Sequence, residues 1–157
     1  MPQWVDNTLL VRGPESEIIR FKTAVHVTGG RRASRRTDLS LQALVPRPRY
    51  AGLDRAAAYQ WGVLTWGTPW DVRARLAADG GTILDYAFPS AYGPPLAWLK
   101  TASARFPALE FLLRYHNPSA HVRGSAMVTG GEEDDVRSHF GSFLALQYLK
   151  STEVVKL

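Results

Sequence analysis

The stretch Tyr59–Asp71 reads YQWGVLTWGTPWD and is the densest aromatic segment of the chain. Three of the five tryptophans fall within ten residues, and a Gly-Thr-Pro turn separates the last two. Aromatic side chains bury a large area in fixed geometry. The stretch therefore predicts either the centre of a packed core or a recognition surface.

The residues after this stretch predict a hairpin. Apolar and polar side chains alternate over residues 70–78, which is typical of a half-buried strand. The sequence Asp79-Gly80-Gly81 predicts a tight turn. A return strand is expected over residues 82–88.

Outward from this hairpin, the periodicity predicts further strands over residues 4–12, 109–115 and 121–128, and helices over 54–64 and 94–106. A first helix is expected to begin at Pro14 and to end at Gly29-Gly30. The acidic run 132–135 after a Gly-Gly break predicts the first turn of a C-terminal helix over about 132–150, because carboxylates favour a helix N-terminus. Residues 27–69 are expected to form an insertion of helix and loop after the first helix.

Without the insertion the order is strand-helix-strand-strand-helix-strand. That order predicts an α+β fold, a ferredoxin-like antiparallel sheet with two helices on one face, in a single domain over residues 1–157. The extra strand and final helix extend it. In this topology Trp4, Trp70, the turn 90–95 and residues 115–118 share one end of the sheet, which we call the pole. The arginine-rich loop is expected to leave the first helix at the same end.

The amino-acid composition limits the classes of protein to which this chain can belong. Hydrophobic residues make up 45% and charged residues 21% of the 157 residues, as in ordinary globular proteins. The chain has no cysteine, which excludes disulfides and thiolate chemistry. No apolar run reaches the roughly 18–20 residues of a membrane span, and the N-terminus lacks a signal-peptide pattern. We expect a cytoplasmic protein without membrane, cofactor or metal.

Most of the net charge of +5 comes from one short segment of the chain. Arg31, Arg32, Arg35 and Arg36 lie in one short loop, so the rest of the chain is nearly neutral. Arginine forks bind phosphate and acidic protein patches, and clustered cations give salt-dependent binding to nucleic acids. The alternative is a solvated loop without a partner.

Four segments resemble one family. The family motifs Met-Pro-Asn-Trp-Cys, Trp-Gly-Thr-Lys-Trp, Phe-x-Thr-Ala-Trp-x-Pro-Pro and Tyr-x-Glu-Pro are matched in part by residues 1–7, 66–70, 88–95 and 115–118. The chain thus resembles the YubB ferredoxin-like family, small proteins carried by phages and plasmids. The resemblance covers residues 1 to about 128 and implies a fold and a mobile-element origin.

The departures from the family pattern bear on function. Val5, Pro69 and Asn117 stand where the family has Cys, Lys and Glu, so any titratable group of the family at this end of the sheet is missing here. The chain also has no P-loop, dinucleotide-binding glycine motif or Ser-His-Asp pattern. These absences favour a protein that is not an enzyme.

We therefore expect a phage-encoded, non-catalytic module that binds a host macromolecule, preferably a host protein, in the host cytoplasm. The predicted partner-binding residues are Arg31, Arg32, Arg35, Arg36, Trp66, Trp70 and Tyr92. The alternative function is a nucleic-acid-binding accessory protein that uses the Arg31–Arg36 loop. An enzyme would need a pocket at the pole with at least two titratable groups of shifted pKa. The alternative for the tryptophans is a packed plug at the end of the sheet. The oligomeric state stays open.

Overall fold

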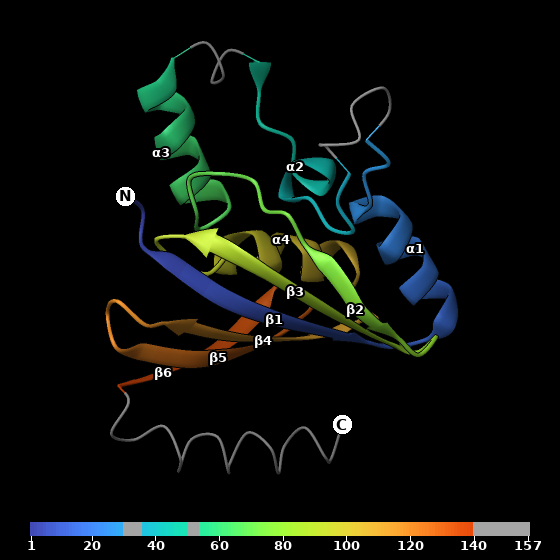
Figure 1. Ribbon diagram of the computed structural model, residues 1–157. Helices are drawn as coiled ribbons and strands as arrows, with labels where there is room; N and C mark the ends of the chain where they lie inside the picture. The colour runs from blue at the N-terminus through green and yellow to red at the C-terminus, as the bar shows by residue number, and fades with distance from the viewer. Residues whose placement is uncertain (30–35, 50–53, 140–157) are drawn as a thin grey trace.

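The computed structural model describes residues 1–29, 36–49 and 54–139, with side chains described as far as residue 133. It is an α+β fold built on a six-stranded sheet in the order β2-β3-β1-β4-β5-β6, and every neighbouring pair is antiparallel (Figure 1). The strands are β1 (Trp4–Arg12), β2 (Arg75–Asp79), β3 (Ile83–Ala91), β4 (Glu110–Asn117), β5 (Val122–Thr129) and β6 (Glu132–His139).

Helices α1 (Glu15–Val25) and α4 (Leu96–Arg105) lie on the same side of this sheet (Figure 1). Alternate residues of β1 face them and are buried, while the residues between them are more exposed. At the centre of the core, Phe21 of α1 makes edge-to-face contacts with Tyr86, Phe106 and Phe111 at ring-centroid distances of 5.3–6.3 Å. The period-two pattern of the strands therefore places the core between sheet and helices.

The strand register forms the pole. Trp4 pairs with Ala91, so β1 begins where β3 ends, and Asp6 pairs with His116 near the end of β4. The prediction that these three strand ends meet is confirmed. The residues before β2 reach the same end of the sheet through Trp70, whose ring lies 6.2 Å from that of Tyr92.

The insertion contains two helices, α2 (Leu41–Leu44) and α3 (Arg55–Thr65). Helix α3 begins as its sequence predicts, because the Asp54 side chain accepts the Ala56 amide at 2.9 Å and caps the first turn. Its only buried residue is Gly62. A Cβ at Gly62 would lie 2.5 Å from the carbonyl oxygen of Pro69, so the glycine lets the helix backbone rest on the turn before Trp70.

The strand predicted over residues 70–78 is wrong in its first half, because β2 begins only at Arg75. The preceding residues bond to the insertion instead of to β3. The Asp71 carboxylate accepts the Leu41 amide and the Ser40 hydroxyl, both at 2.6 Å. The Ala74 amide donates to the Thr37 hydroxyl at 2.9 Å. Side-chain hydrogen bonds between this segment and the insertion thus replace a strand ladder.

The helix predicted over about 132–150 is wrong over Glu132–His139, which forms the edge strand β6 paired with β5. Gly130 and Gly131 have φ values of 58° and 87°, and two consecutive positive φ angles are what a tight hairpin requires. The turn therefore overrides the helix signal of the acidic run. Residues 140–150 of the predicted helix lie outside the described residues. In the described part of the chain, no helix has the length and apolar character needed to cross a membrane.

Candidate functional site

Trp66 belongs to the core and cannot contact a partner, so its prediction as a surface residue is wrong. It is 1% exposed, and its indole nitrogen donates to the Val45 carbonyl at 3.0 Å. The Arg47 guanidinium lies 4.8 Å from the Trp66 ring and donates to the Pro69 carbonyl at 2.8 Å. A buried indole needs such an acceptor, and here the acceptor ties the insertion to the core. Trp66 is therefore part of a packed plug at the end of the sheet, which was the alternative prediction for the tryptophans.

The N-terminus of α4 is closed by the same turn. The Trp98 amide donates to the Trp66 carbonyl at 3.1 Å, and the Trp98 indole donates to the Leu41 carbonyl at 3.0 Å. Gly67 has a φ of 91°, and a Cβ there would lie 2.9 Å from the Pro94 carbonyl oxygen. In the first turn of α4, the amides of Leu96, Trp98 and Leu99 therefore all donate to carbonyls of the protein.

Trp70 and Tyr92 lie at the surface together with Tyr59, and we call these three residues the aromatic cluster. Their side chains belong to residues that are 44%, 46% and 40% exposed. The ring centroids are 6.3 Å apart for Tyr59–Trp70, 6.4 Å for Tyr59–Tyr92 and 6.2 Å for Trp70–Tyr92. Three distant segments thus bring three half-exposed rings into mutual contact. Sequence analysis did not select Tyr59 for the site, although it opens the aromatic stretch.

The backbone fixes the position of Tyr92. Its φ is 63°, which is uncommon for a residue other than glycine, and its amide donates to the Gln3 carbonyl at 2.7 Å. The next residue, Gly93, closes a tight turn by donating to the Ala91 carbonyl at 2.7 Å. Because a left-handed tyrosine persists only where its surroundings determine it, this turn holds the ring in the aromatic cluster.

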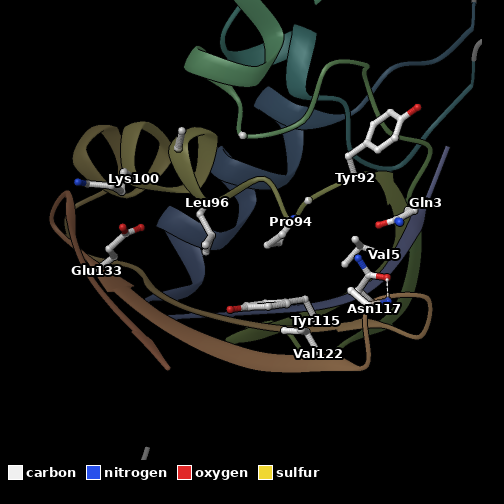
Figure 2. Close-up of a pocket in the computed structure, with 14 residues that line it drawn as sticks. Gln3, Val5, Tyr92, Pro94, Leu96, Lys100, Tyr115, Asn117, Val122 and Glu133 are labelled. Atoms are coloured by element: carbon white, nitrogen blue, oxygen red, sulfur yellow. Dashed lines mark hydrogen bonds between the residues drawn. The ribbon is translucent and has the colours of Figure 1, made fainter. Parts of the chain in front are cut away.

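A cleft of about 680 Å³ lies beside the aromatic cluster (Figure 2). Tyr115 and Val122 lie on one side of it, and Pro94 and Leu96 lie opposite them. Lys100 and Glu133 stand at one end, and Gln3 and Asn117 at the other. The Tyr92 ring points away from the cleft, although its backbone lines it.

Gly124 allows Tyr115 to lie flat along the cleft. The two residues are cross-strand partners in β4 and β5, and Tyr115 is 5% exposed. A Cβ at position 124 would lie 2.3 Å from the ring carbon Cζ and the phenol oxygen of Tyr115. The ring therefore covers the glycine, an arrangement in which an aromatic side chain protects a bare stretch of strand.

The arginine loop lies outside this site as far as it is described. Arg31, Arg32 and Arg35 are outside the described residues, whereas Arg36 is exposed. The base of the loop is closed by two hydrogen bonds between Val27 and Thr37, of 3.0 and 3.1 Å. This base adjoins the end of α1, and in Figure 1 helix α2 stands between it and α3. Among the described residues, no cation–π contact joins Arg36 to the aromatic cluster.

Two pKa shifts have structural causes. Burial, followed by the nearby carboxylates, raises the pKa of the Tyr86 phenol, which lies in the core. The hydrogen bond from Lys22 and then that from the Gly81 amide lower the pKa of Asp79. Within the described residues, no three His, Asp or Glu side chains are grouped closely enough to hold a metal ion.

Comparisons with known proteins do not show a family for this chain. No protein-family model matches the chain, and no curated protein matches it. A solved structure, described as protein api92 from Yersinia pseudotuberculosis with the family model DUF1281, is similar to it with a TM-score of 0.43 and 20% identity. The match covers 53% of this chain and 30% of that one, so this chain spans less than a third of the structure it resembles. A resemblance of that extent identifies neither a family nor an activity.

Proposed function

We propose that this chain is a phage-encoded, non-catalytic module that binds a host protein through the aromatic cluster. The supporting observation is that three aromatic rings stay 40–46% exposed while they contact one another. Tryptophan and tyrosine dominate the binding energy of protein interfaces, because they bury large area with little loss of side-chain freedom.

The aromatic cluster is preorganised, which lowers the cost of binding. The turn before Trp70 is held by the Thr68 hydroxyl, which donates to the Ala91 carbonyl at 2.8 Å, and by the Asp71 carboxylate after it. Tyr92 is held by its own backbone turn. Rings fixed in this way lose little entropy when a partner covers them.

We propose further that β1, α1, β2, β3, α4 and β4 form a ferredoxin-like unit, to which β5 and β6 are added. The order β2-β3-β1-β4 with antiparallel pairing, and the two helices on one face, support this proposal. The segments that carry the YubB resemblance also meet at the pole, where residue 4 pairs with 91, residue 6 pairs with 116, and Trp70 touches Tyr92. The mobile-element origin rests on that resemblance.

Affinity capture from a lysate of the host bacterium, with and without nuclease, tests the function. We expect a partner that resists nuclease and that binds the Trp70→Ala and Tyr59→Ala variants about 30-fold more weakly, since interface hot spots contribute about 2 kcal/mol or more. Ile19→Ala is the matched control, because Ile19 is a 57% exposed apolar residue on α1, away from the aromatic cluster. A partner held equally by wild type and both cluster variants would refute the proposal.

Comparing capture with and without nuclease distinguishes the alternative function from the proposed one. Capture that disappears with nuclease, weakens with salt and depends on Arg31, Arg32, Arg35 and Arg36 would instead support a nucleic-acid-binding accessory protein. Of these four arginines the structure describes Arg36, which is exposed and free to contribute to such binding.

A further inference from the structure

We propose that the cleft beside the aromatic cluster binds an extended, uncharged peptide segment that inserts one apolar side chain. This deepens the proposed function and rests on it in one respect, namely that the segment belongs to the partner protein. The cleft volume of about 680 Å³ lies within the range of roughly 300–1,000 Å³ that is usual for ligand sites.

Asn117 supplies a donor for the peptide backbone. Its residue is only 9% exposed, and its side-chain oxygen accepts the Ala120 amide at 3.1 Å, which fixes the orientation of the side-chain amide. Its amide nitrogen lines the cleft and donates to no described residue (Figure 2). This nitrogen is not fully buried, so solvent in the cleft reaches it, and a peptide carbonyl entering the cleft would replace that solvent as its acceptor.

The middle of the cleft supplies the apolar contact. The face of Tyr115 and the side chain of Val122 lie opposite Leu96, and Val5 closes the inner wall. None of these side chains carries a charge, and Gly124 keeps the Tyr115 ring flat against β5. An aliphatic or aromatic side chain of a ligand would be buried between these groups.

The charges of the cleft favour a neutral backbone over a nucleic acid. One lysine, Lys100, and one glutamate, Glu133, line it, so their charges cancel. At the N-terminus of α4, the amides of Leu96, Trp98 and Leu99 already donate to carbonyls of the protein. A phosphate backbone needs several uncompensated cations, which the described lining of the cleft does not have.

Tyr92 connects the cleft with the aromatic cluster. Its backbone lines the cleft, while its ring contacts Tyr59 and Trp70 outside it. A partner can therefore cover the aromatic cluster and insert an adjoining segment into the cleft without a break between the two surfaces.

Selection from a displayed library of random linear peptides tests the proposal. We expect enriched peptides to share an apolar residue and to bind wild type. Asn117→Asp keeps the acceptor for the Ala120 amide but removes the donor, so we expect it to weaken binding about tenfold. Leu96→Trp enlarges a side chain that points into the cleft from α4 (Figure 2) and should abolish binding, whereas Ala57→Leu, at an exposed position of α3, should not change it.

Thermal melts of both cleft variants establish that they are folded, and Asn117→Asp gives a nearly isosteric change if Leu96→Trp does not fold. Peptides that bind both variants as tightly as wild type, an unenriched library, or a single-stranded oligonucleotide that binds the cleft would each overturn the proposal. A lysate partner lost with Trp70→Ala but fully retained with Leu96→Trp overturns the cleft alone. Peptides that need the cleft, in a protein that captures no lysate partner, support the cleft and refute the proposed function.

Discussion

Replacement of Asp71 by alanine should release the insertion from the sheet. The Asp71 carboxylate accepts the Leu41 amide at 2.6 Å, the Ser40 hydroxyl at 2.6 Å and the Val72 amide at 2.9 Å. Asp71 itself is exposed, but its two donors belong to residues that are 0% (Leu41) and 3% (Ser40) exposed, so water replaces the lost acceptor only in part. An unsatisfied buried donor costs roughly 1–3 kcal/mol and the hydroxyl bond adds about 1, which gives about 2–4 kcal/mol for Asp71→Ala.

The free energy of unfolding in urea, followed by tryptophan fluorescence and circular dichroism, measures this loss. With a slope of roughly 2 kcal/mol per molar urea, the midpoint should fall by about 1–2 M. Asp71→Asn should cost less, about 1 kcal/mol, because its amide oxygen still accepts the Leu41 N–H. Asp6→Ala is the control, since Asp6 is exposed on β1. A loss below about 0.5 kcal/mol for Asp71→Ala, the range of ordinary surface changes, would refute the reasoning.

Three further predictions concern close contacts and one ion pair. Gly62→Ala should destabilise the fold by up to about 2 kcal/mol, because overpacking against a rigid backbone costs about 1–3 and the gain in helix propensity returns about 1. Gly124→Ala should cost about 1–3 kcal/mol and displace the Tyr115 ring, seen as a changed near-ultraviolet circular dichroism spectrum. Lys22→Ala should raise the pKa of Asp79 toward its ordinary value, measured by NMR titration. Because the folded pKa is lowered, the stability from Asp79 is present above the ordinary pKa and lost as pH falls through the folded one, and Lys22→Ala should reduce this dependence.

Each of these predictions has a control and a contradicting result. Ala57→Gly on the exposed side of α3 should lose about 1 kcal/mol from propensity alone, and a stabilising Gly62→Ala would show that no clash exists. Ser125→Ala, next to Gly124 in β5, should leave the Tyr115 signal unchanged, and an unaltered signal in Gly124→Ala would contradict the packing. Glu17→Ala removes the separate ion pair with Arg20 and should not change the pKa of Asp79. If Glu17→Ala changed this pKa and Lys22→Ala did not, the 2.6 Å contact from Lys22 would be excluded as the cause of the lowered pKa.

The hydrophobic pattern of the sequence was sufficient to predict most of the strands and helices. Periodicity predicted the strands β1, β3, β4 and β5 and the helices α1, α3 and α4. It failed at residues 70–74 and 132–139, where the local signal was real but a nonlocal interaction was stronger. At the first site the carboxylate of Asp71 binds the insertion, and at the second a Gly-Gly turn pairs an acidic segment with β5.

The candidate site was predicted in part. The sequence indicated which aromatic residues lie near the pole, but Trp66 became core and Tyr59 joined the surface. The difference arises because Gly62 lets α3 approach the turn before Trp70, and periodicity carries no information about that contact. The cleft was not predicted, since its walls come from β1, α4, β4, β5 and β6 and no local motif encodes them.

By itself, the sequence determined the α+β class, the order of the main elements, the absence of cysteine chemistry and the concentration of unusual residues at one end of the sheet. Those properties follow from periodicity, composition and turn chemistry, which act over a few residues. Tertiary structure alone decided which tryptophan is buried and which stays at the surface. The reason is geometric: burial depends on which backbones can approach one another, and here Gly62, Gly67 and Gly124 set those approaches between segments far apart in the chain.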